Sequence, residues 1–445
     1  MRRTGHWRAR ARALVVTALL VGLPASATAQ APAASDEPWS LAALGLKGFL
    51  IFKNFSHFRE SYEDERNFRE EGLLQLEWSR RLAPWADARL IVEARGDDGG
   101  LAEGFTFQIP ETARHRSILG VKEATLRGRA GPIEAALGKQ IYAWGTADAW
   151  NPTDNLNPYD YLDPIDNEKI GVWSVSARAT AGPGSLTFVL VPVFTPSRTP
   201  LSGGRWVPPP PPGVVLAGRE LPGRGPGQMQ YAARARVTVL GWDLSASYFD
   251  GFEHVPVIRQ SETAIAPGVV VPRLTPVYTR MKVAGADFST TLGKLEIHGE
   301  GAAKFVERNG RHDRFHGIFG INYAWDELGF RWLDQVTLIA EYARETILRV
   351  EDGTNLLDPA ALNAFRDAFV SRLQFKFTED TQLKLSAILD LTRQPNDYLQ
   401  AKVSHKLTDA LHLEAGLDFF AGLRESFYGR WKNNDRFFFS AKYYF

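Results

Sequence analysis

The stretch RFFFSAKYYF, residues 436–445, alternates between two kinds of side chain with a period of two. One face of an extended chain would carry Phe437, Phe439, Ala441, Tyr443 and Phe445, and the other would carry Arg436, Ser440 and Lys442. An apolar face toward lipid and a polar face toward a water-filled lumen is typical of a strand in a membrane β-barrel. The stretch also has about the length that a tilted strand needs to cross a bilayer.

The same alternation recurs along the chain, for example over residues 231–239, 383–391 and 411–419. Candidate strands lie near residues 45–55, 70–80, 86–96, 116–129, 132–142, 171–180, 184–193, 228–240, 242–250, 277–290, 293–305, 314–324, 335–346, 367–378, 381–391, 397–407, 410–421 and 435–445. Beyond the N-terminus, no segment has the roughly 18 consecutive apolar residues of a membrane helix, and in lipid a sheet must close to pair its backbone groups. The sequence therefore predicts an all-β fold: a transmembrane antiparallel up-and-down β-barrel of about 16–18 strands.

Short and long connections alternate between these strands. Tight ones fall at residues 81–85, 131–132, 181–184, 240–241, 291–293, 379–380 and 408–409, and long ones at 56–69, 97–115, 143–170, 194–227, 251–276 and 347–366. A barrel with both termini in the periplasm alternates short periplasmic turns with longer outer loops, so this phase favours a barrel over a soluble β-sandwich. The stretch 325–334 is long for a periplasmic turn and could hide a register error.

The N-terminus has the order of a cleaved secretory signal. Arginines precede an apolar run at residues 13–23, and small residues at 27–29 form an A-x-A-like site. The run is too short to span a bilayer, although a single anchoring helix is the alternative. We expect residues 1–29 to be a signal peptide, residues 30–44 a periplasmic lead-in, and residues 45–445 a barrel in the cell outer membrane of a Gram-negative bacterium.

Composition and motifs argue against several classes of function. Removing residues 1–29 takes away five arginines and no acids, which moves the formal net charge from +1 to −4, so no basic surface for nucleic acid is expected. The chain has no cysteine, which excludes disulfides and Cys-ligated metals. It also has no Gly-x-Ser-x-Gly, H-E-x-x-H or phosphate-loop motif, so we expect no enzyme activity and no cofactor.

The C-terminal residue suggests one partner. Phe445 follows alternating aromatic residues, and this ending resembles the signal by which outer-membrane barrels are handed to the barrel-assembly machinery. The alternative, a strand that contributes to an aromatic girdle, also places these residues at a membrane.

The densest group of motifs is LGKQIYAWGTADAWNPTDNLNPYDYLDP, residues 137–164. This segment resembles the porin-like outer-membrane barrels in which a strand ending in G-(K/R)-Q-x-x-x-W-G runs into an N-P-x-D loop. The resemblance covers this segment specifically and the rest of the chain only by architecture. It implies a pore of about eighteen strands with an inward-folded loop around residues 143–170, and it says little about the solute.

The residues of this loop support the same expectation independently. Asn and Asp side chains next to prolines cap their own backbone, which would make the loop compact enough to fold into a barrel mouth. The predicted constriction residues are Trp144, Asp148, Trp150, Asp154, Tyr159, Asp160 and Asp163. The alternative is that the acids only form turns and the aromatic residues form an outer girdle. No metal site is expected, because the acid spacing does not match a calcium loop.

Charged side chains are expected to line the lumen. The predicted lining includes Arg234, Arg236, Glu296, His298, Glu300, Lys376 and Lys402. Among the positions whose inward direction follows from the alternation, there are thirteen bases and seven acids. This excess predicts a mild preference of the pore for anions or carboxylate-bearing solutes. The alternative is that these charges simply pair with one another across the lumen.

Taken together, these features predict passive or facilitated diffusion of small solutes through the barrel. A non-conducting scaffold, adhesion barrel or complex partner is the alternative, with the acidic outer loops and the Pro-rich outer loop around residues 208–212 as contact surfaces. The histidines lack a catalytic arrangement: His298 lies between Glu296 and Glu300 on one strand face, which fits a lumen residue.

Overall fold

The computed structural model describes residues 45–61, 64–105, 109–307, 312–326, 328–350, 356–357, 364–392 and 396–445. The predicted signal peptide, residues 1–29, and the predicted lead-in, residues 30–44, lie outside these ranges. Within them, no helix is long and apolar enough to cross a membrane.

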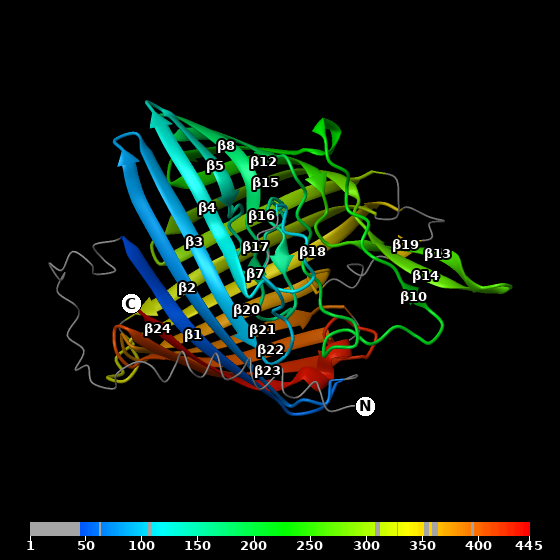
Figure 1. Ribbon diagram of the computed structural model, residues 1–445. Coiled ribbons are helices and arrows are strands. Elements are labelled where there is room, and N and C mark those ends of the chain that lie inside the picture. Colours follow the sequence, from blue (N-terminus) through cyan, green and yellow to red (C-terminus); the bar gives the residue numbers. More distant parts are fainter. Residues whose placement is uncertain are drawn as a thin grey trace.

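Eighteen strands form one antiparallel sheet (Figure 1). They are β1 (Leu46–His57), β2 (Phe68–Ala83), β3 (Ala86–Asp97), β4 (Leu119–Ala130), β5 (Ile133–Gln140), β8 (Val172–Ala181), β9 (Gly184–Val191), β11 (Gln230–Val239), β12 (Trp242–Phe252), β15 (Arg280–Leu292), β16 (Leu295–Val306), β17 (Asp313–Asp326), β18 (Gln335–Arg349), β20 (Asp367–Lys376), β21 (Thr381–Asp390), β22 (Asn396–Lys406), β23 (Leu411–Gly422) and β24 (Arg436–Tyr444). Each pairs with the next in the chain, and β24 pairs with β1, so the sheet closes. The predicted up-and-down barrel is confirmed, at the upper end of the expected strand count.

The register confirms the two faces of the C-terminal strand. Phe437 and Tyr443 lie on the outer face, where they are 38% and 39% exposed to the surroundings of the chain. Arg436 pairs with His57 of β1 and turns inward, where it is buried. A lysine or arginine at a mid-membrane outward position would cost about 2–4 kcal/mol, so the outer apolar face holds the strand in lipid.

The short and long connections also fall as expected. Two-residue turns join β4 to β5 and β11 to β12 at one end of the barrel, which is also where β1 begins and β24 ends. In the uncertain stretch 325–334, β17 continues to Asp326 and β18 begins at Gln335, and Trp325 pairs with Val336 in register. The register error considered for this stretch is therefore not present.

Further short elements lie in the long connections. They are β6 (Tyr159–Asp160), β7 (Glu168–Lys169), β10 (Val215–Leu216), β13 (Val257–Ala266), β14 (Val269–Val277), β19 (Leu356–Leu357) and the 3-10 helices η1 (Pro226–Gln228) and η3 (Gly429–Asn434). Strands β13 and β14 form a hairpin over residues 257–277, although the stretch 251–276 was expected to be a loop. The hairpin projects away from the barrel at the end opposite the C-terminus (Figure 1). Its turn at residues 267–268 places Gly268 at a φ of +75°, a conformation that glycine adopts without strain.

Candidate functional site

The connection between β5 and β8, residues 141–171, is here called the inner loop, and it is folded on itself. Asn157 is buried, and its amide nitrogen donates to the carbonyl oxygens of Gln140 (3.0 Å) and Ile170 (2.9 Å) at the two ends of the loop. Its side-chain oxygen accepts the amide N–H of Tyr142 at 2.7 Å. One Asn thus closes the base of the loop through its donors and its acceptor, as the expected capping role of these residues requires.

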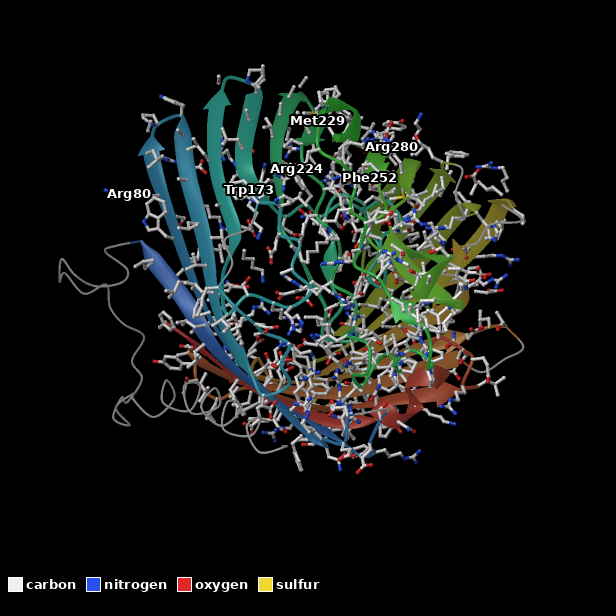
Figure 2. The ribbon with its side chains drawn as sticks, turned by 45° about the vertical axis from the view of Figure 1, so that its right-hand side comes forward. Arg80, Trp173, Arg224, Met229, Phe252 and Arg280 are labelled. Atoms are coloured by element: carbon white, nitrogen blue, oxygen red, sulfur yellow. The ribbon has the colours of Figure 1, made fainter. Side chains whose placement is uncertain are left out.

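The inner loop lies within the ring of strands, where β7 is seen inside the barrel (Figure 1). Figure 2 shows side chains crowding the barrel interior around this loop. The inner loop contacts the inner faces of strands that are far from the loop in the sequence.

Glu300 on β16 is the first anchor of the inner loop. One carboxylate oxygen accepts the amide N–H and the hydroxyl of Thr153, both at 2.7 Å, and the other accepts the amide N–H of Thr146 at 2.9 Å. A side chain at Gly145 would not fit, because a Cβ there would lie 2.3 Å from the Glu300 carboxylate and the φ angle is +96°. The loop backbone therefore wraps a buried carboxylate, as peptide N–H groups do in anion-binding nests.

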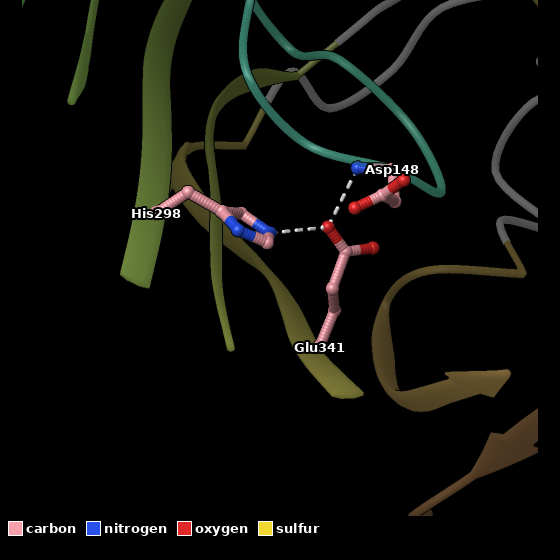
Figure 3. A group of neighbouring side chains, drawn as sticks. All are labelled: Asp148, His298 and Glu341. Atoms are coloured by element: carbon pink, nitrogen blue, oxygen red, sulfur yellow. Dashed lines mark hydrogen bonds and ion pairs between the residues drawn. The ribbon is translucent and has the colours of Figure 1, made fainter. Parts of the chain in front are cut away.

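Glu341 on β18 is the second anchor (Figure 3). Its carboxylate accepts the amide N–H of Asp148 at 2.7 Å and that of Ala149 at 2.9 Å. The same carboxylate contacts Nε2 of His298 at 2.8 Å, and the side chains of Glu341 and His298 are fully buried. Two buried side chains of the wall thus fix the tip of the loop.

Asp148, His298 and Glu341 could hold a divalent metal ion by ligand type, since one atom of each lies within 4.8 Å of the others. However, Glu341 is already occupied by His298 and loop amides, and the Asp148 carboxylate accepts from Asn322 Nδ2 at 3.2 Å. Hydrogen bonding accounts for these positions without an ion.

The acidic part of the inner loop pairs with arginines of the opposite wall. Asp163 is fully buried, and its carboxylate accepts from Arg69 of β2 at 2.6 Å and from Arg436 of β24 at 2.5 Å. Burial alone would raise the pKa of Asp163, but the Arg436 and Arg69 guanidiniums hold it far below its ordinary range. The carboxylate therefore stays charged at any physiological pH.

Asp160 forms a similar arrangement. Its carboxylate accepts from Arg116 at 3.0 Å and from Arg198 at 2.9 Å, and all three side chains are buried. Burial opposes ionisation, yet the two guanidiniums lower the pKa of Asp160 below its ordinary value. Each buried acid thus has two cationic partners, which is the arrangement that compensates for the loss of water.

The predicted aromatic residues of the loop pack inside the barrel rather than in an outer girdle. Trp144 is buried, with the guanidinium of Arg234 5.8 Å from its ring centroid. Trp150 stacks on Phe365 at 5.8 Å between ring centroids and meets His316 edge-on at 4.6 Å. Tyr159 and Tyr161 stack on each other at 5.4 Å.

The remaining predicted residues divide into those that lie in or near the inner loop and those that lie away from it. Asp154 pairs with Lys169 within the inner loop, and Arg234 pairs with Asp287 at 3.1 Å. Glu296, His298 and Glu300 come together at the loop tip, with Glu296 accepting from Asn322 at 3.2 Å. Arg236, Lys376 and Lys402 pair away from the loop, with Asp243, Glu379 and Glu414 respectively.

The sequence reasoning missed Arg69, Arg116 and Arg198, which hold the acids of the loop. Arg116 and Arg198 lie 44 and 38 residues from Asp160. Such separations carry no periodic signal. Arg69 and Arg198 lie in segments expected to be outer connections, and Arg116 is the first residue of an expected strand.

A small cavity opens beside these contacts. It has a volume of about 50 Å³ and is lined by Glu93, Arg95, Glu111, Arg116, Lys122, Lys139 and Arg198, among others. A space of this size holds a few water molecules rather than an organic solute.

Comparison with known proteins shows distant likeness only. No family model and no curated protein matches the sequence. One mutant of the Rhodopseudomonas blastica porin has 10% identity and a TM-score of 0.41, over 90% of this chain and 99% of the porin. Another mutant of that porin has 9% identity and a TM-score of 0.42, with the same coverage. A structure described as "Asymmetric conductivity of engineered proteins" has 10% identity and a TM-score of 0.42 over 90% of this chain and 99% of that one. At this level, the likeness carries no inference about what the chain does.

Proposed function

We propose that the chain is an outer-membrane channel for passive or facilitated diffusion of small solutes, narrowed by the inner loop. The observation that carries the proposal is that the loop is anchored on opposite walls. It bonds to Glu300 of β16 on one side and to Arg69 of β2 on the other. In the closed order of eighteen strands, β16 lies nine strands from β2 in either direction, so the loop crosses the lumen.

Barrel geometry supports this reading. The lumen widens with the number of strands, and barrels of 16–18 strands leave an aqueous channel unless something fills it. Anchored by buried carboxylates and guanidiniums on both sides, the inner loop reduces the passage without depending on flexible surface contacts. The apolar outer face of the strands supports placement in the outer membrane, where barrels of this kind meet lipid on all sides.

Conductance across planar lipid bilayers tests the proposal. We expect the purified chain to conduct, and deletion of residues 150–164 to increase the single-channel conductance. A deletion of equal length in the β13–β14 hairpin, residues 259–273, is the matched control, because this hairpin projects away from the barrel. Absence of conductance would favour the scaffold alternative, and equal conductance in both deletions would remove the constriction role.

A further inference from the structure

Three cations lie together on the inner wall formed by β20, β21 and β22. Arg372 belongs to β20, Lys384 to β21 and Lys402 to β22. Their inward direction follows from the register: Ser386 pairs with both Arg372 and Gln400, and Lys384 pairs with Lys402. Gln400 in turn donates to Asp418, which lies inside the barrel beside Arg436.

Lys384 and Lys402 stand directly opposite each other on neighbouring strands. The Cβ atoms of such a pair are about 5 Å apart, and like charges in this position destabilise a sheet. Arg372 is placed diagonally to Lys384, since the direct partner of Lys384 on β20 is Gln374, two residues further on. Repulsion between three neighbouring cations lowers the stability of the barrel, and nothing in the barrel fold requires cations at these positions.

Neighbouring acids compensate this charge only in part. Glu414 lies 3.4 Å from Lys402, and its own side chain is 40% exposed. In the part of the chain that the structure describes, no acid lies within ion-pair distance of Lys384, which shares only the more distant Glu414 with Lys402, and Arg372 donates to the hydroxyl of Ser386 at 3.4 Å. The wall therefore carries an excess of positive charge facing the lumen.

Other inward bases are arranged differently. Arg89 on β3 contacts both Glu77 and Glu123, at 2.9 and 3.3 Å. Arg234 on β11 contacts Asp287 at 3.1 Å. Pairing is thus common in this lumen, and Arg372 and Lys384 on the wall of β20–β22 depart from it.

The wall also offers neutral hydrogen-bond donors. The Gln374 amide donates to Gln382 at 3.1 Å, and both residues neighbour Lys384 on the inner face. Guanidinium, ammonium and amide N–H groups together match the oxygens of carboxylates and phosphates. The position is also suitable. Lys402 lies two residues beyond Gln400, toward the short turns and away from Arg436, which holds Asp163 of the inner loop.

We propose that Arg372, Lys384 and Lys402 form a binding station for small solutes that carry a carboxylate or phosphate group. The station rests on the proposed channel function and names the solute class that it favours. An anion that has passed the inner loop would meet these cations before it reaches the short-turn end of the barrel.

Block of the chloride current by citrate or by inorganic phosphate tests the station in planar bilayers. In the variant K384Q/K402Q, we expect the half-blocking concentration to rise about tenfold, because two charge-assisted hydrogen bonds are lost at a partly exposed site. The variant K384R/K402R keeps both charges and should retain block. The control R127Q/R236Q removes two inward bases that have acidic partners, Glu134 and Asp243, and should shift block less than about twofold.

The two probes distinguish the solute classes: block by citrate alone assigns carboxylates, and block by phosphate alone assigns phosphates. A conducting barrel that neither probe blocks, or that both block equally in K384Q/K402Q and in the wild type, would overturn the station alone. A barrel without conductance would overturn the channel and the station with it.

A second variant tests the physical reason. K384E would place a carboxylate opposite Lys402, so we expect a higher urea midpoint of unfolding together with loss of citrate and phosphate block. A lower midpoint with unchanged block would contradict the proposal, because the like-charged pair would then contribute neither repulsion nor binding.

Discussion

Asp163→Asn is the sharpest test of how the inner loop is held. The substitution keeps the shape of the side chain and removes the charge that two buried arginines share. Removing one partner of a buried ion pair costs about 3–5 kcal/mol. Arg436 keeps Asp418 at 2.7 Å and Arg69 keeps Glu71 at 3.2 Å, so we expect the lower end, about 3 kcal/mol.

A cost of about 3 kcal/mol reduces the ratio of docked to undocked inner loop by about a hundredfold. The assay is amide hydrogen exchange of residues 141–171 in the reconstituted barrel, followed by mass spectrometry. Exchange of this segment should accelerate strongly in Asp163→Asn, and the channel current should become noisier. The strands should keep their protection, because their ladders do not depend on the loop.

Asp166→Asn is the matched control. Asp166 lies in the same loop and pairs with Lys53 at 2.5 Å, but the two side chains are 35% and 27% exposed. An exposed pair of this kind contributes about 0–1 kcal/mol. Equal exchange in the two variants, or no change in Asp163→Asn, would refute the reasoning that the buried pair holds the loop.

Three further outcomes are expected. Gly145→Ala should widen the channel, because its Cβ would displace the carboxylate that anchors the loop; Gly213→Ala, at a similar positive φ in open space, should leave conductance unchanged. The pKa values of Asp160 and Asp163 are lowered in the folded barrel. Their contribution to the stability of the docked loop is therefore complete above the ordinary carboxyl pKa of about 4, and it is lost only as the pH falls through the lowered values. Once corrected for the intrinsic exchange rate, amide protection of residues 160–163 should therefore be the same at pH 7 and pH 5 and fall only in stronger acid; a fall near pH 6 would contradict this. Phe445→Ala keeps the terminal backbone bonds to β1 but should reduce the amount of folded barrel in outer membranes, as measured by heat-dependent gel mobility, if the assembly machinery reads the ring; an unchanged amount would remove that partner.

The strands could be predicted from sequence because their signal is local. Alternation between lipid-facing and lumen-facing side chains repeats within each strand, and the structure has a strand at every one of the eighteen expected positions. Closure between β1 and β24 followed from the physical requirement that no edge remains open in lipid.

The β13–β14 hairpin was missed for the opposite reason. Residues 257–277 lie outside the membrane-spanning part, so no lipid face imposes a strict alternation. The proline and glycine at positions 267–268 were a turn signal, but the length and polarity of the stretch favoured a loop.

The contacts of the inner loop could not be predicted because they join distant residues. Asp163 and Arg436 are 273 positions apart, and only the closed barrel brings them together. The count of thirteen bases against seven acids was incomplete, because it left out the strands β1, β2 and β3. Inward residues there include acids, such as Glu71, which stands opposite Lys53 in the register, and Glu93, which stands opposite Gln75, and also bases, such as Lys53 and Arg89. Pairing, rather than the total count, distinguishes one wall from another.

The anchoring of the loop tip has a consequence for how freely its sequence can vary. At residues 146–149, the groups that bind Glu300 and Glu341 are backbone amides, which every amino acid except proline supplies. Side chains at these positions can therefore be exchanged without releasing the tip. An engineer, or evolution, could alter what the constriction recognises here while the scaffold that positions it stays constant.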